Sequence, residues 1–352
     1  MVLLVILGMT GLWLGADVSS LAGRPEVQVR VEGTPMPALE ALRQAGLEWV
    51  RLRLWHGEEH LQQTISLAQR AQALGFRILL AIHYSDTWAD PAQQYPPVAW
   101  QGLPLPVLED SVYHYTHDVL QRFRAAGVLL QGVQVGNEID HGFLWEPGRF
   151  RGTAERSWGL VRLLASALRA VRGAPDTLWV LLSITPRGVP VLRALQEAGI
   201  RWDLTGVSYY PWWHGSLDSL RERLIRLHEE FQRPVLVLET AYPWTLAWAD
   251  DTHNPVGSPT QLLPEFPATP TGQARFLRRL LRMVAETPGG LGVFYWEPVW
   301  LPARRPGEPG SPWENLALFD FQGRALPALQ EFQAYRPSQP SPASRRGFSP
   351  SP

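Results

Sequence analysis

The sequence predicts an α/β protein of the (β/α)8 barrel class, a single domain with its active site at the C-terminal ends of the strands. Eight short runs of β-type, mostly apolar residues recur along the chain, and segments with helical spacing separate them. Near-continuous apolar strands are typical of a parallel sheet that is covered on both faces. The 352 residues suffice for a barrel of about 250 residues with insertions. A doubly wound sheet would share the alternation, but no glycine-rich nucleotide motif follows the first run.

The strands are expected in a regular order along the chain. They are 12–19, 49–55, 77–85, 132–138, 178–184, 204–210, 234–240 and 292–298. The segment "LQQTISLAQRAQALGF" repeats apolar residues at spacings of three and four, so it predicts a helix that ends near Gly75. Long insertions rich in Trp, Pro, Asp and His follow the third, seventh and eighth strands, and we expect them to form the walls of a cleft.

The two ends of the chain differ in character from the barrel. Residues 1–11 belong to an apolar run too short to span a bilayer comfortably, and we interpret them as a shortened signal peptide. Residues 12–335 form the predicted catalytic domain. The tail, 336–352, is rich in Pro and Ser and lacks apolar periodicity, which predicts disorder.

Composition narrows the classes of function. The net charge of -1, with charges scattered along the chain, offers no basic stripe for nucleic acid. The absence of Cys excludes disulfides, thiolate metal sites and a cysteine nucleophile. All 32 basic residues are Arg, so Schiff-base lysines and Walker-type phosphate sites are also excluded. A neutral or weakly charged substrate is the expectation that remains.

Two glutamates stand where predicted strands end. Glu138 in "QVGNEID" follows the fourth strand and Glu239 follows the seventh. In a barrel they would face one another across its mouth, and a pair of carboxyl groups is what glycoside hydrolysis requires. Asn137 could bind a sugar 2-hydroxyl, and Arg53 could hold one carboxylate ionised. The alternative is a pair of ordinary glutamates at loop edges.

Nine segments carry a resemblance to a known family. They are "GADVSSL", "RLRLW", "HYSDTWADPAQQ", "QVGNEIDHGFLW", "GVSYYPWWHGSL", "ETAYPWT", "PATPTGQ", "GVFYWEPVW" and "ENLALFD". In this order they resemble the successive blocks of glycoside hydrolase family 53, the endo-β-1,4-galactanases of clan A. The resemblance extends over nearly the whole chain.

The resemblance implies a fold, a reaction and a set of roles. It implies a (β/α)8 barrel and retaining hydrolysis of β-1,4-galactan, the backbone of type I arabinogalactan in pectin. Glu138 matches the general acid/base, with a raised pKa, and Glu239 matches the nucleophile, with a low one. Asn137, Arg53 and a tyrosine of "SYY" match the residues that orient them, and we favour Tyr209 over Tyr210.

Other positions match the family's substrate groove or its calcium loop. The groove positions are His83, Asp86, Trp88 and His214, with Trp296 as a platform beneath the sugar and Trp300 as the alternative platform. Each could instead only pack its own loop. The reaction needs no cofactor. Some bacterial members bind calcium after the seventh strand, where this chain offers the oxygens of Asp250, Asp251 and Asn254. An acidic loop without metal is the alternative.

The expected partner is a polysaccharide or oligosaccharide, with no nucleic acid and no stable membrane span, and the protein is expected to be a monomer. A polymeric substrate favours a secreted or extracytoplasmic enzyme, while a cytoplasmic enzyme acting on imported oligosaccharides is the alternative. The rival functions are another clan A β-glycanase, such as a mannanase or xylanase, and a non-catalytic carbohydrate-binding barrel.

Overall fold

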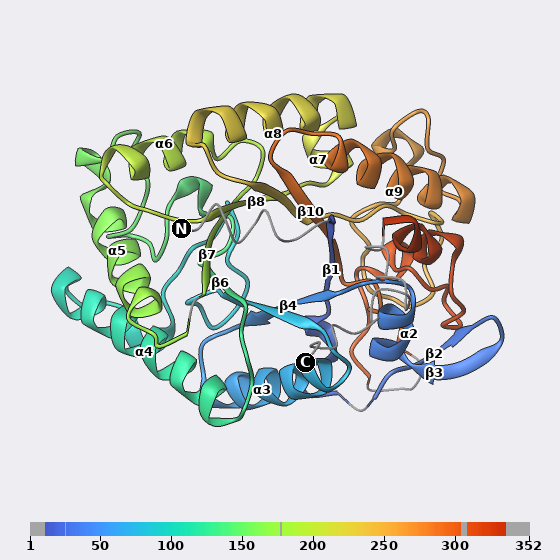
Figure 1. The fold of residues 1–352 in the computed structure, drawn as a ribbon, viewed down its shortest axis with the longest axis horizontal. Coiled ribbons are helices and arrows are strands. Elements are labelled where there is room, and N and C mark those ends of the chain that lie inside the picture. Colours follow the sequence, from blue (N-terminus) through green and yellow to red (C-terminus); the bar gives the residue numbers. More distant parts are fainter. Residues whose placement is uncertain (1–10, 25, 177, 304–307, 336–352) are drawn as a thin grey trace, which may run out of the picture.

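Eight parallel strands close into a barrel in the computed structural model, which describes residues 11–24, 26–176, 178–303 and 308–335 (Figure 1). The strands are β1 (Trp13–Asp17), β4 (Trp49–Leu54), β5 (Arg77–Ile82), β6 (Gly132–Val135), β7 (Trp179–Ile184), β8 (Leu204–Ser208), β9 (Val235–Glu239) and β10 (Gly290–Trp296). Each pairs with its neighbour in chain order, and β1 closes the barrel against β10. The prediction of a (β/α)8 barrel with these eight strands is confirmed. The predicted signal peptide and tail lie outside the described residues, apart from Gly11.

Helices surround the strand ring (Figure 1). They are α2 (Ala38–Gln44), α3 (Glu58–Ala73), α4 (Leu105–Ala125), α5 (Trp158–Arg172), α6 (Val189–Glu197), α7 (Pro211–His214), α8 (Leu217–Phe231) and α9 (Pro270–Ala285). In α3, Leu61, Ile65 and Ala68 lie at helical spacing and are buried against the barrel. Gly75 follows α3 with φ +79°, the left-handed conformation that ends a helix. The predicted helix end is therefore confirmed.

The long connections follow β5, β9 and β10, as expected, and a further one follows β6. They contain short 3₁₀ helices: η2 (Val98–Trp100), η3 (Ile139–His141), η4 (Glu155–Ser157), η5 (Pro259–Gln261), η6 (Glu314–Leu316) and η7 (Pro327–Tyr335), while η1 (Ser19–Leu21) follows β1. The sequence did not predict the hairpin of β2 (Gln28–Val31) and β3 (Thr34–Pro37), which lies at the periphery of the barrel (Figure 1). Pro35 and Pro37 within β3 hide its strand character, because proline is found in strands that sit at an edge.

The lower interior of the barrel, nearer the N-terminal ends of the strands, is filled by apolar side chains. Its members are Trp13, Trp49, Leu79, Leu181, Leu204, Leu236, Leu238, Leu291 and Phe294. The indoles of Trp13 and Trp49 stack with ring centroids 4.2 Å apart. Gly15 leaves room for Phe294, since a Cβ at Gly15 would lie 2.5 Å from that ring. This packing closes the lower end and leaves the upper end for a pocket.

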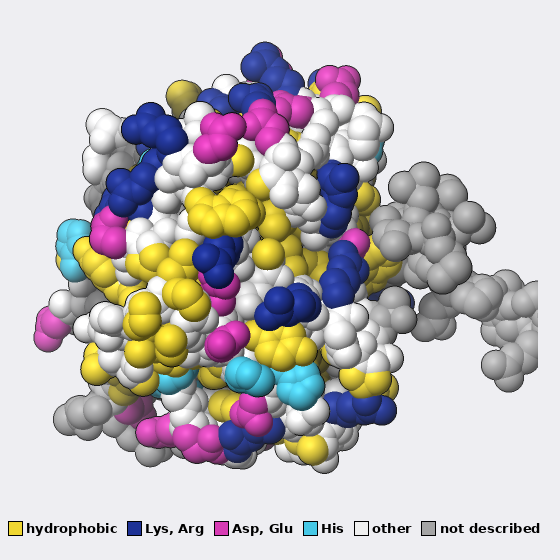
Figure 2. Space-filling view, turned by 90° about the vertical axis from the view of Figure 1, so that its left-hand side faces the viewer, with side chains coloured by type: hydrophobic (Ala, Val, Ile, Leu, Met, Phe, Trp, Pro, Cys, Tyr) yellow, Lys and Arg dark blue, Asp and Glu magenta, His cyan; other side chains and the backbone are white. Residues whose placement is uncertain are grey.

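On the outer face formed by α4, α5 and α6, basic and acidic side chains are interspersed (Figure 2). Several of them pair, such as Arg162 with Glu109 and Arg193 with Glu230. No helix within the described ranges is long and apolar enough to cross a membrane.

Candidate active site

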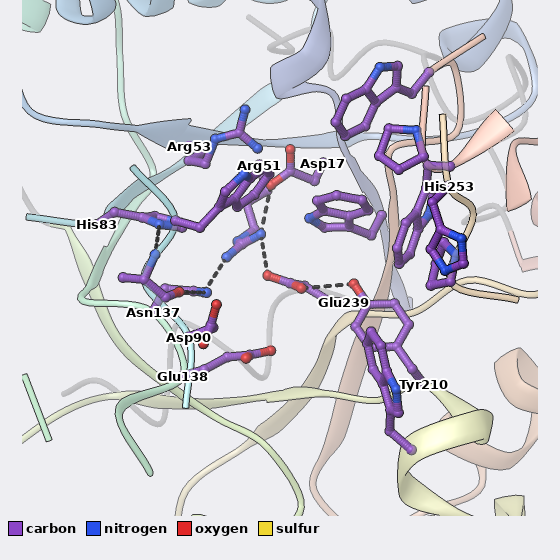
Figure 3. Close-up of a pocket in the computed structure, with 18 residues that line it drawn as sticks. Asp17, Arg51, Arg53, His83, Asp90, Asn137, Glu138, Tyr210, Glu239 and His253 are labelled. Atoms are coloured by element: carbon purple, nitrogen blue, oxygen red, sulfur yellow. Dashed lines mark hydrogen bonds and ion pairs between the residues drawn. The ribbon is translucent and has the colours of Figure 1, made fainter. Parts of the chain in front are cut away.

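A pocket of ≈ 370 Å³ opens at the C-terminal end of the barrel. Its volume is that of a small-molecule site. All four long connections supply part of its wall, and the strand ends supply its floor. The lining residues include Asp17, Arg51, Arg53, His83, Trp88, Asp90, Asn137, Glu138, Tyr210, Trp213, Glu239, His253, Trp296, Trp300 and Trp313. Glu138 and Glu239 both project into it (Figure 3).

Glu239, the last residue of β9, is aimed inward by a break in strand register. Val207 pairs with Val237, but the next residue, Ser208, pairs with Glu239, so Leu238 is an extra residue in β9. A bulge of this kind changes the direction of the following side chain. Leu238 already faces the barrel interior. Because of the bulge, the carboxylate of the next residue, Glu239, faces the interior as well.

Two donors hold the Glu239 carboxylate. Arg51 Nη1 lies 2.8 Å from Glu239 Oε1, and the Tyr210 hydroxyl donates to Oε2 at 2.9 Å (Figure 3). Glu239 is 6% exposed. Its carboxylate is thus fixed in position while one edge faces the pocket.

Glu138 follows β6 in the left-handed conformation, with φ 44° and ψ 56°. The turn beyond it is anchored by Asp140, whose carboxylate accepts hydrogen bonds from the Thr185 N–H at 2.9 Å and hydroxyl at 2.5 Å. Strain of this kind often marks a functional position when surrounding contacts maintain it. Unlike Glu239, Glu138 has no arginine within ion-pairing distance in the described structure.

Arg51 connects the site, since its guanidinium reaches four side chains. Besides Glu239, it donates from Nη1 to Asp17 Oδ2 at 2.7 Å, from Nε to Gln134 Oε1 at 2.8 Å and from Nη2 to Asn137 Oδ1 at 2.9 Å. Asn137 Nδ2 donates to the Ala89 carbonyl at 2.8 Å. An amide nitrogen carries two hydrogens, so the second one can serve a substrate hydroxyl.

The two glutamates have different surroundings, which affect their pKa values differently. Burial, together with the charge of Glu239, raises the pKa of Glu138 well above its ordinary value. Burial also raises the pKa of Glu239, while the ion pair with Arg51 opposes the rise. The expected raised pKa of Glu138 is therefore found, but the expected low pKa of Glu239 is not, because burial outweighs the arginine.

Two contacts to Glu239 are made by nearby residues of the same type, two positions away on β4 and one position away after β8. Arg51, not Arg53, pairs with Glu239. Arg53 stacks between Trp55 and Trp88, 4.3 and 4.1 Å from their ring centroids, and its nearest carboxylate is that of Glu297 at 3.8 Å. The Tyr209 hydroxyl donates to the Gly215 carbonyl at 2.6 Å, away from Glu239, which Tyr210 contacts instead.

The remaining predicted positions divide into two groups. Trp88, Trp296, Trp300 and His83 line the pocket, and burial holds the pKa of His83 well below 6.5. Asp86 and His214 do not line it. Asp86 accepts from the Val98 N–H at 2.7 Å, and His214 Nδ1 accepts from the Tyr210 N–H at 3.0 Å, so both brace the loops around the pocket.

The model of glycosyl hydrolase family 53 matches residues 13–332 of the chain. The chain belongs to this family. It is a glycosidase with a single (β/α)8 barrel.

The matches to similar proteins span most of this chain and most of each similar protein. An "Endo-beta-1,4-galactanase" of Bacillus subtilis (strain 168) is 33% identical over 91% of this chain and 85% of its own. An "Arabinogalactan endo-beta-1,4-galactanase" of Cellvibrio japonicus (strain Ueda107) is 33% identical over 92% and 91%. The solved Ignisphaera aggregans GH53 catalytic domain is 34% identical, with a TM-score of 0.83 over 92% of this chain and 96% of that one.

Sequence reasoning missed several residues of this family 53 site, chiefly Arg51, Asp17, Gln134 and Asp90. A signal was present for the first three. Trp49, Arg51 and Arg53 share one face of β4, since side chains alternate along a strand. A charged residue between apolar neighbours on an interior face indicates a buried polar network. The same reasoning applies to Asp17 at the end of β1 and to Gln134 in β6.

The loop after β9 holds the three predicted calcium residues, and calcium binding there stays a prediction. Both Asp250 oxygens accept backbone N–H groups, Oδ1 from Thr252 at 2.8 Å and Oδ2 from Ala303 at 3.1 Å and Ser311 at 2.9 Å. Asp251 is exposed, whereas Asn254 is buried. Calcium takes six to eight oxygen ligands, and the Asp250 carboxylate already accepts three backbone hydrogen bonds. Within the described ranges, no group of three or more His, Asp or Glu side chains is placed to hold a metal ion.

Proposed function

We propose that this glycosidase is an endo-β-1,4-galactanase that cleaves galactan with retention of configuration. The observation that carries the proposal is the pair of buried carboxyl groups in one pocket, of which only Glu239 is paired with an arginine. The galactanase names of relatives that match this chain over most of their length support the substrate.

In the first step, the Glu239 carboxylate attacks the anomeric carbon of a galactosyl unit. The bond from that carbon to the glycosidic oxygen breaks, and Glu138 gives its proton to the departing oxygen. The raised pKa of Glu138 keeps it protonated for this role. Arg51 and Tyr210 oppose the effect of burial on the pKa of Glu239 and hold its carboxylate in place at the pocket.

In the second step, water attacks the anomeric carbon of the galactosyl-enzyme. Glu138, now a carboxylate, takes the proton of the water, and the bond between Glu239 and the sugar breaks. Both groups return to their starting state, so each turnover consumes one water molecule. No metal is assigned a part in either step.

The aromatic walls suit a sugar chain. Trp88, Trp213, Trp296, Trp300 and Trp313 line the pocket. Indole faces stack on the apolar faces of sugar rings, while polar groups between them bind hydroxyls. The exposed side chain of Trp213, 51% accessible, places such a surface at the rim, where a polymer can continue beyond the cleavage point.

Hydrolysis of purified polymers tests the proposal. The protein is incubated with linear β-1,4-galactan, xylan, mannan and cellulose, and reducing ends and products are followed by chromatography. Short galactooligosaccharides from galactan alone are the expected result. Release from xylan or mannan alone would assign the site to another β-glycanase, and binding of galactan without hydrolysis would make it a non-catalytic barrel.

Retention is tested separately on the same reaction. Proton NMR of the first products reports their anomeric configuration before mutarotation, and β-products are expected. Initial α-products would replace the covalent step by direct attack of water, with Glu239 as its base.

We further propose that the enzyme works outside the cytoplasm as a monomer. A polymeric galactan cannot cross a membrane before it is cut, which favours a secreted enzyme. Fractionation of the native host with an antibody to the protein, and light scattering of the purified chain, test the two statements. Recovery from the cytoplasm would favour imported oligosaccharides as substrates.

A further inference from the structure

One nitrogen of Arg51 serves two carboxylates. Nη1 lies 2.7 Å from Asp17 Oδ2 and 2.8 Å from Glu239 Oε1, and Figure 3 shows the guanidinium between them. Asp17 and Arg51 are 0% and 1% exposed. Water therefore screens the shared charge little, and what one carboxylate gains from the arginine is limited by the presence of the other.

Asp17 is held firmly in the place where it meets Arg51. Its other oxygen, Oδ1, accepts from the Ser19 N–H at 3.0 Å and from the Ser19 hydroxyl at 2.5 Å. The same hydroxyl accepts from the Arg53 N–H at 2.7 Å, which ties the turn after β1 to β4. Only Oδ2 of Asp17 is left for Arg51.

We propose that Asp17 is a positioning residue that divides the charge of Arg51 between two carboxylates and thereby keeps Glu239 more basic than an undivided ion pair would. A nucleophile held by an arginine alone would be stably ionised but weakly reactive, because its electron pair is strongly stabilised. A second carboxylate on the same guanidinium weakens that hold without moving Glu239. The inference rests on the proposed function, since it concerns the nucleophile of that reaction.

Several other charged or titratable groups face this cluster, and in the described structure none of them forms an ion pair with Arg51 as Asp17 does. They are Tyr210 after β8, Glu138 after β6, Arg53 on β4, His83 after β5 and Glu297 after β10. Tyr210 donates a hydrogen bond to Glu239, and Arg53 faces Glu297. Once the charge of Asp17 is removed, Glu239 is the one carboxylate among the described residues that still pairs with Arg51.

The test is the pH profile of kcat/KM for galactan hydrolysis by Asp17→Asn. The acidic limb reports the ionisation of the nucleophile. Without the Asp17 charge the pKa of Glu239 falls, so the limb is expected to move to lower pH by about one unit, and the plateau is expected to fall because the nucleophile is less basic. An acidic limb at the wild-type position would overturn the proposal.

Asp203→Asn is the matched control. Asp203 also pairs with an arginine, Arg172 at 2.7 Å, and accepts a backbone N–H from Val180 at 2.8 Å, but it precedes β8 at the opposite end of the barrel. This variant should melt at a lower temperature and keep the wild-type pH profile. A shift in Asp203→Asn as large as that in Asp17→Asn would assign the effect to lost stability and overturn the proposal.

A second variant guards against failure to fold. Asp17 lines the pocket, so formate can reach the space left in Asp17→Ala, and added formate should return the acidic limb toward the wild-type position. If neither variant folds, as judged by circular dichroism and melting, Asp17 is needed for folding rather than for tuning and the proposal is wrong. If wild type cleaves a different β-glycan, the proposed substrate fails, and the same profiles measured on that polymer still decide the role of Asp17.

Discussion

The lower and upper halves of the barrel interior are built from the same strands with opposite chemistry. On β4, Trp49 stacks against Trp13 in the apolar lower half, and two residues later Arg51 pairs with Asp17 and Glu239 in the upper half. On β1, Trp13 and Asp17 make the same contrast. The two halves lie on one face of each strand, because side chains that share a face are two residues apart.

The difference shows where stability and function reside. Apolar burial in the lower half stabilises the fold. Charges in the upper half must be desolvated, and ion pairing returns only part of that cost. A barrel selected for stability alone would continue the apolar packing upward. The polar upper half is therefore the part of the interior that the reaction requires.

The largest expected effect is loss of either glutamate from the upper half. Glu138→Gln removes the proton donor and should reduce kcat by about 10²–10⁴-fold, and Glu239→Gln should reduce it at least as much because both steps pass through that carboxylate. Melting temperatures should stay close to wild type, since neither side chain packs the lower half. Near wild-type hydrolysis of galactan by either variant would refute the assigned roles.

Truncation of a side chain in the lower half should reduce stability and leave the catalytic properties unchanged. Trp49→Ala removes a stacked indole and should cost about 3–5 kcal/mol of unfolding free energy, measured by urea denaturation. At a low temperature where the variant is still folded, the KM and the pH profile should match wild type. A changed pH profile in this variant would mean that the two halves are not separable.

The two adjacent tyrosines after β8 differ in whether they contact the polar upper half. Tyr210→Phe removes the hydrogen bond to the Glu239 carboxylate, and a bond to a charged group contributes about 1.5–3 kcal/mol, so kcat should fall by about 10- to 100-fold. That bond holds the pKa of Glu239 down, so the acidic limb should move to higher pH.

Tyr209→Phe is the control for this variant. It deletes a hydroxyl that bonds only the Gly215 carbonyl. The pH profile should be unchanged, and the melting temperature should fall slightly. Equal kinetic effects of the two substitutions would contradict the assignment of Tyr210.

The pH dependence of stability at Glu297 measures how much a buried charge in the upper half destabilises the fold. Burial and the nearby Asp17 raise the pKa of Glu297 from 4.5 to about 8, against the opposing charge of Arg53. The folded protein thus binds this proton more tightly than the unfolded chain does. The stability from that proton is complete below about pH 4.5 and is lost as the pH rises toward about 8.

Melting temperatures of wild type and Glu297→Gln across this range check the sign. The variant should gain over wild type as the pH rises to 8, because a neutral amide has no proton to lose, and the two should converge near pH 4.5. Parallel curves would show that Glu297 does not carry this dependence.

The smallest effect is expected at the rim above the polar half. Trp213→Ala removes a pocket-lining indole that is 51% exposed. An aromatic contact contributes about 0.5–1.5 kcal/mol, so KM for long galactan should rise by up to about tenfold with kcat unchanged. Trp158→Ala, which alters an indole 59% exposed outside the pocket, should leave both constants unchanged. An equal rise in KM for both would point to a general effect of surface aromatics.

Local sequence patterns predicted most of this fold but failed at particular residues. The alternation of apolar runs and helical spacing predicted all eight strands, and the position of Glu138 and Glu239 after β6 and at the end of β9 predicted that they meet. The hairpin of β2 and β3 was missed because its prolines resemble a loop. Calcium binding by Asp250, Asp251 and Asn254 stays a prediction, and the hydrogen bonds of Asp250 to distant backbone groups could not be foreseen from one loop.

Periodicity and residue type along the chain were enough to predict the barrel, its apolar strands and the pair of glutamates at their C-terminal ends. Neighbouring residues of the same type could be told apart only in the folded protein. Arg51 rather than Arg53 meets Glu239 because two residues along β4 correspond to about 6.6 Å of depth. Tyr210 rather than Tyr209 meets it because adjacent side chains point in opposite directions. The bulge at Leu238 that turns Glu239 inward exists only in the pairing of β8 with β9.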